Sequence, residues 1–181
     1  MASLKQVARG ALDAAGLGRL YVRYHEWRIS REREPPPPAT DDGIPLPPLF
    51  LMTVVAGAAD WRWFVESGAR IAQALDQYAQ EGGRGFAQAR RILDFGCGCG
   101  RVIRNLPKLT SAELFGVDSN AALVNWCAEN LPGVFGRNRG RPPLKFPDQH
   151  FDIVYLMSVF THMRRETHLA WLAELCRVTQ P

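Results

Sequence analysis

Residues 91–101, Arg91-Ile92-Leu93-Asp94-Phe95-Gly96-Cys97-Gly98-Cys99-Gly100-Arg101, decide the fold of this chain. A short apolar run ends in the carboxylate of Asp94, and three glycines then alternate with two cysteines. Residues 102–106 follow with apolar positions spaced as in a helix. A strand, a glycine turn and a helix in this order let a nucleotide-like ligand approach the backbone, because glycine carries no Cβ. The stretch therefore predicts an α/β fold with a ligand-binding turn.

The spacing of the glycines separates two classes of ligand. A dinucleotide-binding turn has the pattern Gly-x-Gly-x-x-Gly. Gly96 and Gly98 fit this pattern, but Arg101 occupies the third glycine position and Gly100 comes one residue too early. A nicotinamide-dependent oxidoreductase is therefore the lesser alternative for the function of the chain.

Length and composition narrow the class of protein. The chain has 181 residues, of which 46% are hydrophobic and 22% charged, and this balance suits a globular protein with a real core. Its formal net charge of +4 is too mild to indicate a nucleic-acid partner. The four cysteines do not have the pattern of a disulfide framework, which favours a cytoplasmic location. Cys97 and Cys99 lack a matching Cys/His cluster, so no metal site is expected.

Residues 1–34 have the pattern of a basic, partly amphipathic helical arm. Such an arm either docks on a membrane surface or a partner, or it packs on the domain or stays partly disordered. We favour the second alternative, because its charge is modest for electrostatic membrane binding. No secretory signal is evident, and the most apolar run, 49–59, is shorter than the roughly 20 residues that a membrane span needs.

The order of these features predicts three segments. An arm and a proline-rich linker occupy 1–40, and a helical lead-in that packs on the sheet occupies 41–88, with a helical face that begins at Asp60 and ends near Gly82. The ligand-binding domain then occupies 89–181.

A second acidic strand end follows the glycine turn. Residues 113–118 form a short apolar run closed by Asp118, at about the distance after the turn where a nucleotide fold places the carboxylate that accepts from ribose hydroxyls. A helix is expected over 121–131, so the alternative role of Asp118 or Ser119 is to cap that helix. We favour ribose binding for Asp118, because the strand, the glycine turn and the acid agree in order and spacing.

The last part of the chain completes a parallel sheet. Residues 134–135 begin a third strand, and 151–157 form a nearly continuous apolar run, as expected for a strand buried on both faces. Residues 158–162 lie at the carboxyl end of that strand, where open α/β sheets bind ligands. The basic loop 137–150 lacks the interleaved aromatic residues of a single-strand nucleic-acid site. A final helix is expected around 169–176.

Several stretches together resemble the class I S-adenosylmethionine-dependent methyltransferases: the glycine turn 93–101, the acidic strand end 115–118, the strand 147–162, and the helix 171–178. The resemblance covers 89–181. It implies a Rossmann-like, doubly wound parallel sheet that corresponds to the N-terminal half of that fold, preceded by an N-terminal helical extension.

The resemblance also implies a cofactor, S-adenosylmethionine, and an acceptor that is a small molecule or a glycan precursor. Asp94 and the glycines would hold the methionine end of S-adenosylmethionine, and Asp118 would bind the ribose hydroxyls of this cofactor. The positions that the resemblance assigns to the cofactor are Asp94, Phe95, Gly96, Gly98, Gly100, Asp118, Ser119, Asn138, Ser158 and Phe160. His162 is the candidate general base, because its pKa range suits proton transfer; the alternative is that it caps the next helix or makes a local hydrogen bond.

One departure from the family concerns the end of the chain. The family continues into a fifth strand, whereas this sequence stops at Pro181, so an exposed edge is expected on the fourth strand. Such an edge invites pairing with another chain, and a homodimer through it is one expectation. A non-catalytic module that binds S-adenosylmethionine or a partner is the alternative to an active methyltransferase.

Overall fold

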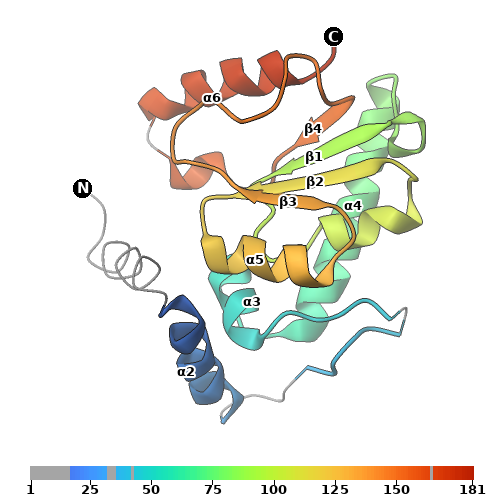
Figure 1. Cartoon of the computed structure of the whole chain (residues 1–181). Coiled ribbons are helices and arrows are strands. Elements are labelled where there is room, and N and C mark those ends of the chain that lie inside the picture. Colours follow the sequence, from blue (N-terminus) through green and yellow to red (C-terminus); the bar gives the residue numbers. More distant parts are fainter. Residues whose placement is uncertain (1–16, 32–35, 42, 164) are drawn as a thin grey trace. The chain divides into compact units, whose positions relative to one another are not determined.

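The computed structural model describes residues 17–31, 36–41, 43–163 and 165–181 (Figure 1). The chain divides into two compact units, one up to Phe64 and one from Val65 to Pro181. The segment boundaries expected at 40/41 and 88/89 stay predictions, and residues 1–16 and 32–34 of the expected helical arm lie outside the described residues. Within the described ranges, no helix combines the length and the apolar character needed to cross a bilayer.

Among the described residues of the first unit, two short helices form, α2 (Gly18–Ser30) and α3 (Leu49–Ala56). The helix α4 (Trp61–Glu81) starts at the end of this unit and continues into the second. Its bounds confirm the helix that the apolar spacing predicted between residue 60 and the glycine pair 82–83.

The helices α2 and α3 contact each other through rings and a carboxylate. The rings of Tyr21 and His25 lie against the ring of Phe50, with centroids 5.6 Å and 4.8 Å away. The carboxylate of Glu26 accepts hydrogen bonds from the backbone N–H groups of Leu49 (3.0 Å) and Phe50 (2.7 Å). These N–H groups have no partner inside α3, so an acid of α2 caps the first turn of α3.

The second unit contains a four-stranded parallel sheet with the strand order β3-β2-β1-β4 (Figure 1). Its strands are β1 (Arg91–Phe95), β2 (Glu113–Asp118), β3 (Val134–Arg137) and β4 (Ile153–Tyr155). The helix α5 (Ala121–Asn130) lies next to β2 and β3, and α6 (Arg165–Val178) lies on the β4 side of the sheet. This arrangement confirms the predicted Rossmann-like α/β fold.

The two faces of β1 separate the core from the polar site. Alternate residues of a strand point to opposite faces. Leu93 and Phe95 therefore lie in one cluster with Trp171 of α6. Asp94 points to the other face. It pairs in register with Gly116 of β2 and with Tyr155 of β4. The further members of the apolar cluster are Val117, Leu144, Phe151, Leu175 and Val178.

Two elements differ from their predictions. The segment expected to form a helix after the glycine turn is the 3-10 helix η2 (Ile103–Lys108), because Pro107 removes a donor and its ring would clash with a carbonyl one α-helical turn earlier. The fourth strand is shorter than the apolar run 151–157. Phe151 pairs instead in a parallel bridge with Thr179, which follows α6, and so lies outside β4.

Candidate functional site

The glycine turn after β1 is held in a conformation that side chains rarely adopt. Gly96, Gly98 and Gly100 have φ angles of 84°, 57° and 78°, in the left-handed region that glycine tolerates. The backbone N–H groups of Gly96 and Cys97 donate to the carbonyl of Val117 at 2.7 and 3.1 Å. The turn is therefore tied to the end of β2.

Side chains of the same protein leave no room for a Cβ at two of these glycines. An added Cβ would lie 2.4 Å from Val159 at Gly96 and 2.3 Å from Leu131 at Gly100. The first contact brings the segment after β4 against the turn. The carboxyl ends of β1, β2 and β4 therefore meet around the glycines.

Asp118 connects three strand ends through its own atoms. Its Oδ2 accepts from the N–H of Gly98 at 3.0 Å, and its Oδ1 accepts from the N–H of Asn120 at 2.8 Å. Its backbone carbonyl accepts from the N–H of Asn138, the residue after β3, at 3.1 Å. The side chain of Asp118 thus faces the glycine turn.

The helix cap falls on a residue that sequence reasoning missed. The side chain of Asn120 accepts from the N–H of Ala122 at 3.1 Å and caps α5. Ser119 is exposed, and its carbonyl accepts from Nε of Arg137 at 2.9 Å. Capping by Ser119 is therefore wrong. Asn120 also has the side chain of a good cap, so its position directly before the helix was the signal that could have identified it.

Asp94 is a buried carboxyl with an unusual acidity. Its residue surface is 3% exposed. Burial raises its pKa to about 7; the nearby hydroxyl of Tyr155 lowers it, the charge of Asp118 raises it, and the charge of Arg101 lowers it. The buried Tyr155 hydroxyl meets the distance and angle criteria of a hydrogen bond with no described residue. It nevertheless lies close enough to Asp94 to lower its pKa. A group that is half ionised near neutral pH responds strongly to any charge placed beside it.

Three buried thiols surround the glycine turn. Cys97 and Cys127 both donate to the carbonyl of Gly98, at 3.6 and 3.5 Å. The neighbouring Cys127 thiol and burial raise the pKa of Cys97, and burial raises that of Cys99. Among the residues that the structure describes, no three His, Cys, Asp or Glu side chains are placed to share a metal ion. The thiols are therefore neutral packing groups.

The segment after β4 supplies a third side of the site. Ser158 is exposed and has a φ of 57°, and its carbonyl accepts from the hydroxyl of Thr161 at 2.6 Å. The ring of Phe160 stacks on that of His168, with centroids 5.2 Å apart. Nε2 of His168 lies 2.9 Å from the Phe160 carbonyl, so this histidine supports the 3-10 helix η3 (Phe160–His162). The side chain of His162 itself lies outside the described part of the structure.

Asn138 carries an unpaired buried acceptor at this edge of the sheet. Its Oδ1 is shielded from solvent and has no hydrogen-bond partner among the described residues. A buried polar atom without a partner costs about 1–3 kcal/mol, so such atoms are rare outside functional sites. The backbone N–H of Asn138 donates a hydrogen bond to the carbonyl of Asp118. The Asn138 residue therefore lies beside the carboxyl end of β2, which is predicted to bind ribose.

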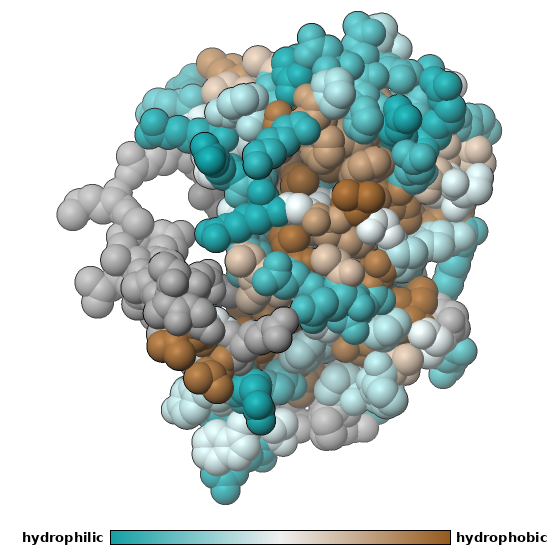
Figure 2. All heavy atoms as spheres, in the orientation of Figure 1, coloured by the Kyte–Doolittle hydropathy of each residue, from teal (hydrophilic) through white to brown (hydrophobic). Residues whose placement is uncertain are grey.

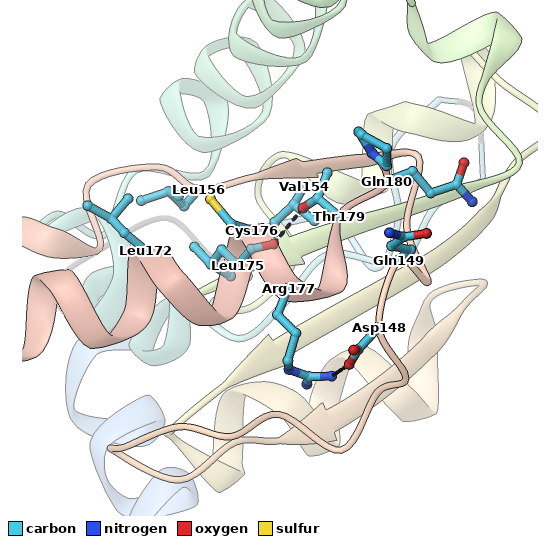
Figure 3. A pocket seen from close by; sticks show the side chains of 11 residues that line it. Asp148, Gln149, Val154, Leu156, Leu172, Leu175, Cys176, Arg177, Thr179 and Gln180 are labelled. Atoms are coloured by element: carbon cyan, nitrogen blue, oxygen red, sulfur yellow. Dashed lines mark hydrogen bonds and ion pairs between the residues drawn. The ribbon is translucent and has the colours of Figure 1, made fainter.

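A groove of about 600 Å³ lies elsewhere, between α6 and β4 at the edge of the sheet (Figure 3). Its apolar lining consists of Val154, Leu156, Leu172, Leu175 and Cys176. It shares no lining residue with the glycine turn, so it is separate from the site at the strand ends. The groove follows the strand edge through which the sequence predicts pairing with a second copy, and that homodimer stays a prediction.

Comparisons with known proteins agree with this arrangement. Residues 92–181 match the family model described as a methyltransferase domain. An uncharacterised methyltransferase of Schizosaccharomyces pombe is 32% identical over 110 residues, which cover 50% of this chain and 36% of that protein. The chain therefore spans well under two thirds of the length of this relative.

Solved structures share the fold at low sequence identity. A Methanococcus maripaludis protein, provisionally described as an S-adenosyl-L-methionine-dependent methyltransferase, has a TM-score of 0.52 at 12% identity, over 73% of this chain and 57% of that chain. The YcgJ protein of Bacillus subtilis has a TM-score of 0.50 at 21% identity, over 60% of this chain and 45% of that chain. At these identities the likeness shows a common fold.

Proposed function

Because residues 92–181 form a methyltransferase domain of the class I, S-adenosylmethionine-dependent type, we propose that this chain binds S-adenosylmethionine and transfers its methyl group to a small-molecule or glycan-type acceptor. One observation carries the proposal. The glycine turn, the carboxylate of Asp118 and the unpaired Oδ1 of Asn138 converge at the carboxyl ends of three adjacent parallel strands. Open α/β sheets bind their ligands at this end.

Asp118 has the capacity to accept from the ribose hydroxyls. An ionised carboxylate offers about four lone-pair positions. The N–H groups of Gly98 and Asn120 use one position on each oxygen and fix the plane of the group. The remaining positions can accept two hydroxyl groups without any rearrangement of the side chain.

Asp94 supplies a carboxylate for the cationic end of the cofactor. When bound, S-adenosylmethionine supplies an electrophilic methyl group on a sulfonium, next to a methionine ammonium. The charge of Asp94 attracts both cations across the glycine turn, and burial strengthens this attraction because little water screens it. The backbone of Gly96, Gly98 and Gly100 allows close approach, since no Cβ stands in the way.

The residues after β4 complete the acceptor side in this proposal. Ser158 and Phe160 lie on the segment that approaches the glycine turn through Val159, and this position supports a role for them beside the reacting end of the cofactor. Holding the acceptor in line and excluding water supplies most of the rate in such a displacement. The proton that leaves the acceptor goes to solvent or to a base, for which His162 stays the predicted candidate.

Calorimetric titration at different pH values tests the role of Asp94 in cofactor binding. We expect the affinity of the wild type for S-adenosylmethionine to rise about tenfold between about pH 6 and about pH 8. The sign follows from its pKa of about 7: at the lower pH the carboxyl is mostly protonated, and a bound cation favours the ionised form. Binding at the lower pH should therefore release close to one proton, measured in two buffers of different ionisation enthalpy.

Asp94→Asn provides the control for titration of the ligand itself. The variant cannot ionise, so its affinity should match that of the protonated wild type and lose the part of the pH dependence that comes from the protein. If wild type and Asp94→Asn bind with the same pH profile, Asp94 does not contact the cation.

Asn138→Ala tests the contact with the base of the cofactor. The 6-amino group of adenine can donate a hydrogen bond to Oδ1 of Asn138. Loss of one neutral hydrogen bond costs about 0.5–1.5 kcal/mol. We therefore expect binding of S-adenosylhomocysteine to weaken about 2- to 13-fold in this variant. Asn130→Ala, at the far end of α5, is the matched control, because its amide already donates to Trp126 and should not affect binding.

A ligand analogue decides whether the adenine is the partner of Asn138. The wild type should discriminate between S-adenosylhomocysteine and its analogue without the 6-amino group, and Asn138→Ala should bind both equally. If wild type and Asn138→Ala discriminate equally between the two ligands, the adenine base does not contact Asn138.

A further inference from the structure

The helix α2 carries two different faces. Tyr21, His25 and Glu26 face α3, where the rings pack on Phe50 and the carboxylate caps the helix. The face turned away from α3 exposes large side chains at helical spacing. Leu20, Tyr24 and Trp27 are 60%, 57% and 55% exposed. Leu17, directly before the helix, is also exposed. Exposed apolar groups gathered on one helix face mark an interaction surface.

Over residues 17–31, this exposed face of α2 carries arginines and no acidic side chain. Arg23, Arg28 and Arg31 are exposed beside the apolar and aromatic residues, and the guanidinium of Arg31 lies over the ring of Trp27, 4.9 Å from its centroid. Glu26 is the only acidic residue in the sequence from 17 to 31, and its carboxylate is bonded to the N-terminus of α3. In Figure 2, hydrophobic (brown) and hydrophilic (teal) residues lie side by side on the part of the surface that α2 occupies in Figure 1. The face therefore matches an anionic, partly apolar partner.

The charge of residues 1–34 as a whole is modest, but exposed arginines gather on one face of α2 beside exposed apolar and aromatic groups. We propose that this face, formed by Leu20, Tyr24, Trp27, Arg23, Arg28 and Arg31, binds the surface of an anionic lipid membrane. Tyrosine and tryptophan favour the level of the lipid headgroups. The leucine reaches the acyl boundary, and the arginine side chains extend to the phosphates.

The chemistry of this face favours lipid over nucleic acid. A strand of nucleic acid is usually bound in a basic groove with aromatic side chains for the bases to stack on. The face of α2 is the outside of a helix, and the exposed leucines beside its rings have no partner in nucleic acid, whereas a lipid interface accepts both the apolar and the cationic groups.

Vesicle sedimentation with the full chain tests the proposal. The wild type should sediment with vesicles that mix phosphatidylglycerol with phosphatidylcholine, should not sediment with pure phosphatidylcholine, and should be released as the salt rises from about 0.1 to about 0.5 M. Each arginine near an anionic surface contributes roughly fivefold, so Arg23→Glu/Arg28→Glu/Arg31→Glu should weaken partitioning by at least about 100-fold.

Two further variants separate this face from net charge and from folding. Arg139→Glu/Arg141→Glu/Lys145→Glu changes the net charge equally at an exposed loop of the second unit and should retain vesicle binding. Tyr24→Ser/Trp27→Ser keeps every arginine and should still weaken binding at least about tenfold, because the aromatic groups that favour the headgroup level are lost. Circular dichroism checks that each variant is folded.

Three outcomes would overturn the proposal. The first is equal binding to neutral and anionic vesicles, and the second is equal loss of binding in both charge-reversal variants. The third is no binding of the folded wild type to anionic vesicles; if a single-stranded RNA oligonucleotide then binds, the face recognises nucleic acid instead. None of these measurements depends on S-adenosylmethionine, so the proposal fails or holds independently of the proposed function.

Discussion

Asp118→Ala is expected to weaken binding of S-adenosylmethionine by about 100-fold or more. In the proposed complex the carboxylate accepts from two ribose hydroxyls, and a hydrogen bond to a charged group is typically worth about 1.5–3 kcal/mol. The substitution also removes the acceptor of the Gly98 and Asn120 N–H groups, so the glycine turn loses a contact that shapes it. Isothermal titration calorimetry measures the change directly.

The other end of β2 offers a matched control. Glu113 is a carboxylate on the same strand, it is exposed, and it pairs with Arg91 at 3.1 Å on the protein surface. An exposed ion pair contributes little to stability, so Glu113→Ala should bind the cofactor as the wild type does. Equal affinities of wild type and a folded Asp118→Ala would remove Asp118 from the site. No binding by a folded wild type would contradict the proposed function of the chain as it stands.

The features that the sequence predicted correctly are local in the chain. A parallel strand buried on both faces is apolar throughout, so β1 and β2 are visible as short runs closed by Asp94 and Asp118. The glycine turn was predictable because left-handed φ angles and close contacts require glycine itself. Because carboxyl ends of parallel strands share one edge, the meeting of these residues followed from the fold class.

The features that could not be predicted depend on register and on contacts distant in sequence. The burial of Asp94, which raises its pKa, and its position opposite Tyr155 both require the alignment of β1 with β4. The length of β4 depends on the bridge between Phe151 and Thr179, a pairing that exists only after α6 has packed. No sequence period indicates that His168 supports η3, because the contact is made across the turn between η3 and α6.

Gly68→Ala is expected to destabilise the second unit by about 3 kcal/mol, although alanine is the better helix former. Gly68 lies in α4, and a Cβ there would stand 2.0 Å from the backbone carbonyl oxygen of Arg101 and 3.2 Å from Nδ2 of Asn105. That carbonyl is fixed, since it also accepts from Nδ2 of Asn105 at 3.1 Å. The contact cannot be relieved by turning a side chain, so α4 and the segment after the glycine turn must separate.

A substitution in the same helix isolates this contact from helix propensity. Ala74 is exposed on α4, and Ala74→Gly should cost only about 1 kcal/mol, the ordinary difference between the two residues. On propensity alone, Gly68→Ala should stabilise by that amount. Thermal unfolding should instead show a midpoint lowered by about 10 °C. A midpoint equal to or above that of the wild type would mean that α4 does not lie against Arg101. A lowered midpoint together with weakened cofactor binding would show that the close approach of α4 also shapes the glycine turn, because the displaced carbonyl follows directly after Gly100.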